Sequence, residues 1–183
     1  MTPYQLHKKK WISCKRCPLC ETRKNVVLVR GKLPCDVLFV GEAPGVSEDT
    51  LGKPFVGPAG KLLDKIIEEA GGSVGRVRLA FTNVLGCIPY DEEGKKVSDP
   101  KDWPREALIR CAPRLIDLMC MAKPSKIVAV GQVSAKQLGK TDVEFVEIVH
   151  PAAILRANPA NQGLMYQKCV VTLSEVFESL IPF

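Results

Sequence analysis

The side chains of this sequence with the clearest capacity for chemistry are its cysteines. There are eight, and three of them stand two residues apart in the run Cys14-x-x-Cys17-x-x-Cys20. In a reducing compartment, paired cysteines favour a metal ion or an iron–sulfur cluster over disulfides. The basic start of the chain lacks the apolar stretch of a signal peptide, and no apolar run approaches the ~18 residues of a membrane helix. We therefore expect a cytoplasmic protein with no membrane partner and with a cysteine-bound metal or cluster.

Polar clusters follow apolar stretches at three places in the chain, residues 41–45, 82–83 and 150–151. In the first, Glu42 stands between two glycines, whose backbone N–H groups can closely approach a planar ligand. This cluster lacks the G-x-G-x-x-G spacing of a dinucleotide site. Residues 57–62 resemble a P-loop only superficially, because Leu62 replaces the Ser/Thr that would hold magnesium. A nucleotide hydrolase is therefore disfavoured.

Apolar runs and helical spacing predict the elements that must position these clusters. Buried strands are expected at 36–40, 78–84, 126–131 and 143–149, and helices at 62–70, 104–121, 132–138 and 162–180. We expect loops at residues 41–58 and 91–101. A further loop is expected to begin at residues 150–151, after the fourth strand. Alternating strands and helices predict a mostly parallel sheet covered on both faces, with function at the carboxyl ends of its strands. With 183 residues, 46% of them hydrophobic, the chain is predicted to form a single domain over 1–183.

Positive charge is concentrated at the N-terminus. The net charge is +6, but residues 1–33 hold nine Lys/Arg and one acidic residue, so this Cys-rich segment carries about +8. Such a segment suits contact with phosphate groups, although a solvated surface would explain it as well.

Several ordered motifs over residues 14–160 resemble the family 4 uracil-DNA glycosylases, the iron–sulfur branch of that superfamily. They are the Cys14/Cys17 pair, G-E-A-P-G, E-D-x-x-G-K-P-F-V-G-x-A-G-x-L-L, Thr82-Asn83, Cys87, Cys111 and His150-Pro151-Ala152. The resemblance implies the uracil-DNA glycosylase fold, a three-layer α/β/α sandwich with a central, mostly parallel four-stranded sheet. It also implies a monomeric enzyme that flips uracil out of single- or double-stranded DNA and hydrolyses its N-glycosidic bond, leaving an abasic site.

The resemblance further implies roles for residues of the three clusters. Glu42 orients the attacking water and stabilises the sugar cation, and His150 donates to uracil O2, aided by backbone N–H groups near Glu42 and Ala43. Substrate binding is assigned to Gly41, Ala43, Glu48, Phe55 and Asn83. Among these, Phe55 stacks on uracil, Asn83 reads its N3/O4 edge, and Glu48 walls off its C5 side.

DNA contact and metal binding are implied in the same way. Leu155 is the apolar wedge that enters the base stack and Arg156 a phosphate contact, although here Ala157 separates Arg156 from the family's Asn-Pro. The implied ligands of a [4Fe–4S] cluster are Cys14, Cys17, Cys87 and Cys111. Zinc is the alternative metal, and Cys20 an alternative ligand. The cysteines at 35, 120 and 169 are expected to be buried hydrophobes.

Two other functions are weighed against this one. A noncatalytic DNA-binding or replication-accessory module could retain the fold and the cluster. A glycosylase for other deaminated bases could retain the site as well. Zinc deaminase chemistry is disfavoured because the H-x-E signature is absent, and strand cleavage is not expected because no lysine in the motifs is placed to form a Schiff base.

Overall fold

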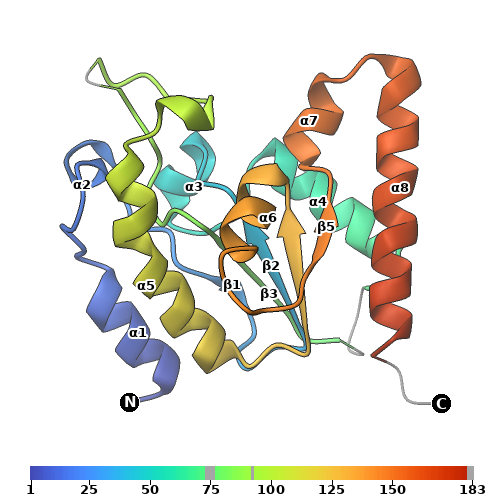
Figure 1. The fold of residues 1–183 in the computed structure, drawn as a ribbon, viewed down its shortest axis with the longest axis horizontal. Coiled ribbons are helices and arrows are strands. Elements are labelled where there is room, and N and C mark those ends of the chain that lie inside the picture. Colours follow the sequence, from blue (N-terminus) through green and yellow to red (C-terminus); the bar gives the residue numbers. More distant parts are fainter. Residues whose placement is uncertain (73–76, 92, 181–183) are drawn as a thin grey trace.

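A five-stranded sheet forms the centre of the molecule (Figure 1). The structure is a computed structural model that describes residues 1–72, 77–91 and 93–180. The strand order is β1-β3-β2-β4-β5, with bounds β1 Arg30–Gly31, β2 Val37–Gly41, β3 Leu79–Asn83, β4 Lys126–Val130 and β5 Val146–Ile148. Strands β2 to β5 pair in parallel, and β1 pairs antiparallel with β3. The mostly parallel sheet is thus confirmed, but the predicted number of four strands was wrong, because the two-residue β1 has no apolar alternation to reveal it.

Helices cover both faces of the sheet, as the predicted three layers require (Figure 1). The apolar residues of β2 supply a core on each face, because successive side chains of a strand point to opposite faces of the sheet. Val37 and Phe39 pack in a core with residues of α4 (Pro58–Glu69) and α8 (Pro159–Glu178). Leu38 and Val40 pack in a second core with residues of α5 (Arg105–Ala122) and α6 (Gln132–Leu138). The sheet is therefore held rigidly from both sides, and its strand ends are fixed relative to one another.

Two short helices lie where loops were expected. Helix α3 (Val46–Leu51) interrupts the predicted loop 41–58, and α7 (Pro151–Arg156) begins immediately after His150. Each helix has six residues, too few to show helical periodicity in the sequence. In the predicted loop 91–101, a 3-10 turn, η1 (Pro100–Asp102), closes the segment before α5.

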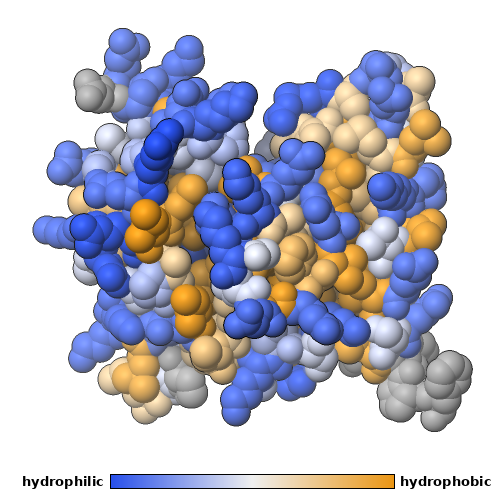
Figure 2. Space-filling model, viewed as in Figure 1, coloured by the Kyte–Doolittle hydropathy of each residue, from blue (hydrophilic) through white to orange (hydrophobic). Residues whose placement is uncertain are grey.

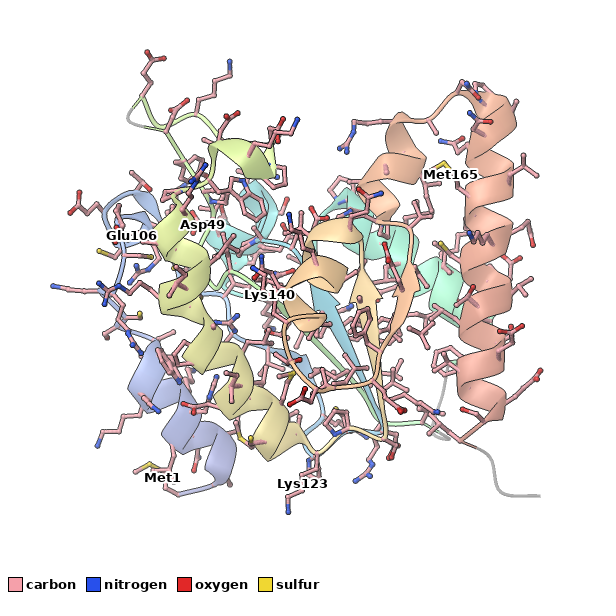
Figure 3. The ribbon with its side chains drawn as sticks, in the orientation of Figure 1. Met1, Asp49, Glu106, Lys123, Lys140 and Met165 are labelled. Carbon is pink, nitrogen blue, oxygen red and sulfur yellow. The ribbon has the colours of Figure 1, made fainter. Side chains whose placement is uncertain are left out.

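The basic N-terminal segment is folded onto the rest of the molecule. It forms α1 (Pro3–Trp11) and α2 (Leu19–Thr22). The Lys10 ammonium and the Trp11 indole N–H both donate to Asp117 on α5. The backbone N–H groups of residues 24 and 25 donate to the buried carboxylate of Asp49 on α3, a residue labelled in Figure 3. Polar contacts therefore anchor this segment at two separate places.

Among the described residues, no helix combines the length and apolar character needed to cross a bilayer.

Candidate active site and cysteine site

The sheet brings the three polar clusters to one edge. Gly41 at the end of β2 is paired with Asn83 at the end of β3. The Val84 N–H donates to the Gly41 carbonyl, and the Leu85 N–H to the Glu42 carbonyl. On the other side of β2, the Gly131 N–H after β4 donates to the carbonyl at the end of β5, two residues before the third cluster. The strand pairing alone therefore fixes the relative positions of the three clusters.

Asn83 and Phe55 meet over Gly41. A Cβ atom on Gly41 would collide with both Asn83 Oδ1 and the Phe55 ring, so only glycine leaves this space open. Phe55 is 6% exposed and adopts φ +56°, a strained backbone for a non-glycine residue. Its backbone rests directly on Gly60 of α4, where any side chain would clash. The glycines of this motif thus allow Phe55 to face the end of β3.

Glu48 connects the loop after β2 to the loop that carries Phe55. One carboxylate oxygen accepts from the Gly45 N–H at 3.0 Å, and the other accepts from the Val56 and Gly57 N–H groups at 2.9 and 2.7 Å. These contacts satisfy three backbone donors beside the site. They give Glu48 an organising role that the resemblance did not predict, while its expected contact with the C5 side of uracil stays a prediction.

Glu42 and His150 face each other across Gly131. A Cβ atom on Gly131 would lie 2.6 Å from Glu42 Oε1 and 2.9 Å from His150 Cβ, and its φ of +94° suits only glycine. Both side chains line a cleft of about 740 Å³ that opens between α7 and the loop before α5, where the surface is hollowed (Figure 2). The cleft is also lined by Ala43, Lys96, Trp103, Val133, Arg156 and Met165, the last labelled on α8 in Figure 3.

Burial shifts the pKa values of the two facing residues in opposite directions. Desolvation raises the pKa of Glu42 above its usual 4.5, although a 3.4 Å hydrogen bond from the Val133 N–H and the charges of Arg156 and Lys96 oppose this. Desolvation lowers the pKa of His150 to about 4, assisted by the same two cations. His150 is therefore neutral at physiological pH. Its Nδ1 accepts from the Ala152 N–H at 3.1 Å, so its proton is on Nε2, which is free to donate.

The proposed DNA-contacting residues lie on α7. Arg156 lines the cleft, whereas Leu155 is 46% exposed and is not among the residues that line it. Ala157 ends α7, and the Asn158 side chain then caps α8 by accepting from the Asn161 N–H at 2.9 Å. Ala157, which is absent from the family's motif, therefore lies in the short connection between α7 and α8.

Four cysteines from distant parts of the sequence line a second cavity. They are Cys14, Cys17, Cys87 and Cys111. The Gly86 N–H donates to Cys111 Sγ at 3.2 Å, and burial raises the pKa of Cys87 to about 12. Cys20 is not among the described residues that line this cavity, and no three Cys, His, Asp or Glu side chains in the described part of the chain are grouped to hold a single metal ion.

The other three cysteines lie away from this cavity. Cys35 and Cys169 are buried, as expected. The expectation for Cys120 was wrong, because it is exposed on the face of α5 opposite its buried residues Leu115, Leu118 and Ala122.

Comparison with known proteins assigns this architecture. The family model for the uracil DNA glycosylase superfamily matches residues 29–174. The chain belongs to this superfamily. A Type-4 uracil-DNA glycosylase of Pyrobaculum aerophilum is 37% identical over 174 residues, covering 82% of this chain and 83% of the relative. The namesake from Sulfurisphaera tokodaii is 38% identical over 131 residues, covering 72% and 56%, and that from Thermotoga maritima is 32% identical over 166 residues, covering 81% of each.

Within this superfamily member, the structure does not gather all predicted residues in one cleft. Glu42, Ala43, His150 and Arg156 line it, whereas Phe55 and Asn83 lie behind Gly41 at 6% and 4% exposure. Five further residues that line the cleft were not predicted from the sequence: Lys96, Trp103, Gly131, Gln132 and Val133. Those at 131–133 had a usable signal, since they follow the apolar run 126–130 just as the other clusters follow theirs.

Proposed function

We propose that this chain is a DNA-repair enzyme that hydrolyses the N-glycosidic bond of uracil in DNA and leaves an abasic site. The observation that carries the proposal is the pairing of Glu42 with a neutral His150 across Gly131, next to the Asn83–Phe55 space. The names of the relatives support the same activity.

Base choice is assigned to Asn83 and Phe55. The Asn83 amide can donate to uracil O4 and accept from N3–H, whereas cytosine reverses both groups and would leave them unpaired. Stacking on Phe55 contributes roughly 1–3 kcal/mol, which offsets the cost of extruding the nucleotide. Glu48 supports this arrangement through the loop that carries Phe55.

Bond cleavage develops opposite charges at its two ends. The Glu42 carboxylate faces the deoxyribose, where it stabilises positive charge and orients the attacking water. Neutral His150 donates from Nε2 to uracil O2, where negative charge accumulates. In this scheme water, and not a lysine amine, attacks the sugar, so we propose that the enzyme is monofunctional and leaves the strand intact.

DNA docking is assigned to α7 and the basic N-terminal segment. Leu155 would enter the space that the flipped base leaves, and Arg156 would contact a phosphate. We propose that the enzyme acts as a monomer on uracil-containing DNA, single- or double-stranded.

The donor set of the cysteine cavity suits a [4Fe–4S] cluster, since four cysteines line it and the Gly86 N–H already donates to Cys111 Sγ. Cys14, Cys17, Cys87 and Cys111 would hold it. When bound, the cluster supplies a structural cross-link between the N-terminal segment and α5. Zinc on the same thiolates is the alternative occupant, and it would require them to move closer together, because the described cysteines are not grouped around a single ion.

Incubation with a uracil-containing oligonucleotide tests the function. Alkali should then cleave the strand only where uracil stood, and Glu42→Ala should reduce the single-turnover rate while leaving DNA affinity nearly unchanged. DNA binding without excision by protein carrying its metal would contradict the proposal and favour the accessory-module alternative. Excision of hypoxanthine or xanthine in preference to uracil would favour the other glycosylase.

A further inference from the structure

Arg114 on α5 is the largest fully buried side chain of the described residues, with 1% of its surface exposed. Each of the three nitrogens of its guanidinium donates at least one hydrogen bond. Nε donates to Cys111 Sγ at 3.4 Å, and Nη1 donates to Thr82 Oγ1 at 3.2 Å. Nη2 donates to the carbonyls of Asn83 and Val84. One side chain therefore touches both the cysteine cavity and the end of β3.

The charge of Arg114 has no acidic partner at bonding distance. None of the four ion pairs found among the described residues includes it. An uncompensated buried charge is costly, commonly several kcal/mol. Thiolates that hold a metal or cluster carry negative charge, and Cys111 is already in contact with the guanidinium. A filled cysteine site would thus supply the missing counter-charge.

The other half of the guanidinium fixes the strand end that presents Asn83. The Asn83 and Val84 carbonyls accept from Arg114, while the Val84 and Leu85 N–H groups donate to the Gly41 and Glu42 carbonyls. Gly86 leaves room for the contact, because a Cβ atom there would lie 3.0 Å from Arg114 Nε. The backbone that carries Asn83 is therefore clamped between Arg114 and the loop that carries Glu42.

We propose that Arg114 is a positioning residue that couples the filled cysteine site to the base-reading amide of Asn83. The inference rests on the proposed uracil excision. With the site filled, the negative thiolates and the carbonyls of Asn83 and Val84 would attract the guanidinium from two sides. This would fix the position of the Asn83 side chain relative to uracil. Without Arg114, the cysteine site and the pocket would act independently.

A double-mutant cycle tests this coupling. We expect Arg114→Met to lower the single-turnover rate on saturating uracil DNA by about tenfold or more, because small displacements of a recognition group are costly. In an Asn83→Ala background the same change should have almost no further effect, since Arg114 acts through Asn83. Arg105→Met, an exposed arginine on the same helix, is the matched control and should leave the rate unchanged. Additive losses in the cycle would overturn the proposal.

A second readout does not depend on activity. Charge and hydrogen bonds to sulfur set the potential of iron–sulfur sites, so Arg114→Met should make the reduction potential of the loaded protein more negative. An unchanged potential would overturn the sulfur contact. If Arg114→Met does not fold, Arg114→Gln, which removes the charge and the guanidinium fork but stays polar, takes its place in both measurements and is judged by the same outcomes. Wild-type protein that excises no uracil would instead refute the proposed function.

Discussion

Glu42 and His150 lie in the same cleft, and burial moves their pKa values in opposite directions. Desolvation disfavours whichever form is charged, so it favours the protonated acid of Glu42 and the neutral imidazole of His150. The imidazole is thereby in the state its role requires at physiological pH. Desolvation works against the charged carboxylate that the role of Glu42 requires. The nearby cations Lys96 and Arg156 partly counter this, because they lower the pKa of Glu42.

This balance predicts the acid limb of the pH–rate profile. Glu42 acts as a carboxylate, so activity should fall as the pH drops through its raised pKa, which places the limb above pH 4.5. Lys96→Met removes a charge that lowers this pKa and should move the limb to higher pH. Single-turnover rates across about pH 4–8 would measure it. Lys95→Met, an exposed neighbour, is the control, and equal limbs in the two variants would contradict the electrostatic role of Lys96.

Among the elements, those with a clear apolar period were predictable and the short ones were not. The four parallel strands and helices α4, α5, α6 and α8 were confirmed with small shifts of their ends. Helices α3 and α7 were missed because local capping by Glu48 and His150 stabilises them, not a long apolar face. The same distinction applies to the site. Motif residues such as Glu42 were identifiable in the sequence, whereas Lys96 and Arg114 matter only through contacts that the fold creates.

Helix α7 supports a prediction about duplex substrates. Leu155 should replace the extruded base, so Leu155→Ala should slow excision from paired DNA by about tenfold or more, while excision from single strands changes little. Leu164→Ala on α8, which is also an exposed leucine, provides the comparison. Equal losses on the two DNA forms would show that Leu155 is not the wedge.

At the scale of the whole molecule, the N-terminal segment is anchored both by polar contacts and by the cysteine cavity. Asp49 and Asp117 hold it at two separate places. Cys14 and Cys17 line one cavity together with Cys87, which follows β3, and Cys111 on α5. Loss of the proposed cluster should therefore loosen the segment without detaching it completely.

Metal content tests this arrangement. Protein purified without oxygen should contain about four irons per chain and absorb broadly near ~400 nm. Alanine at Cys14, Cys17, Cys87 or Cys111 should remove the iron and lower the denaturation temperature, whereas Cys20→Ala should do neither. Colourless protein with one zinc would refute the cluster, and loss of iron in Cys20→Ala would refute the ligand set.

The most direct test of the account is the base preference of Asn83→Asp, measured in single turnovers on matched oligonucleotides that carry uracil or cytosine at one position. Aspartate places an acceptor opposite uracil O4, so uracil excision should fall by about 10² or more, as expected when a buried hydrogen-bonding site meets the wrong partner. The same acceptor suits the amino group of cytosine, so the ratio of uracil to cytosine excision should fall at least as far. An Asn83→Asp variant that retained full uracil activity would contradict the account, because the base would then be read elsewhere.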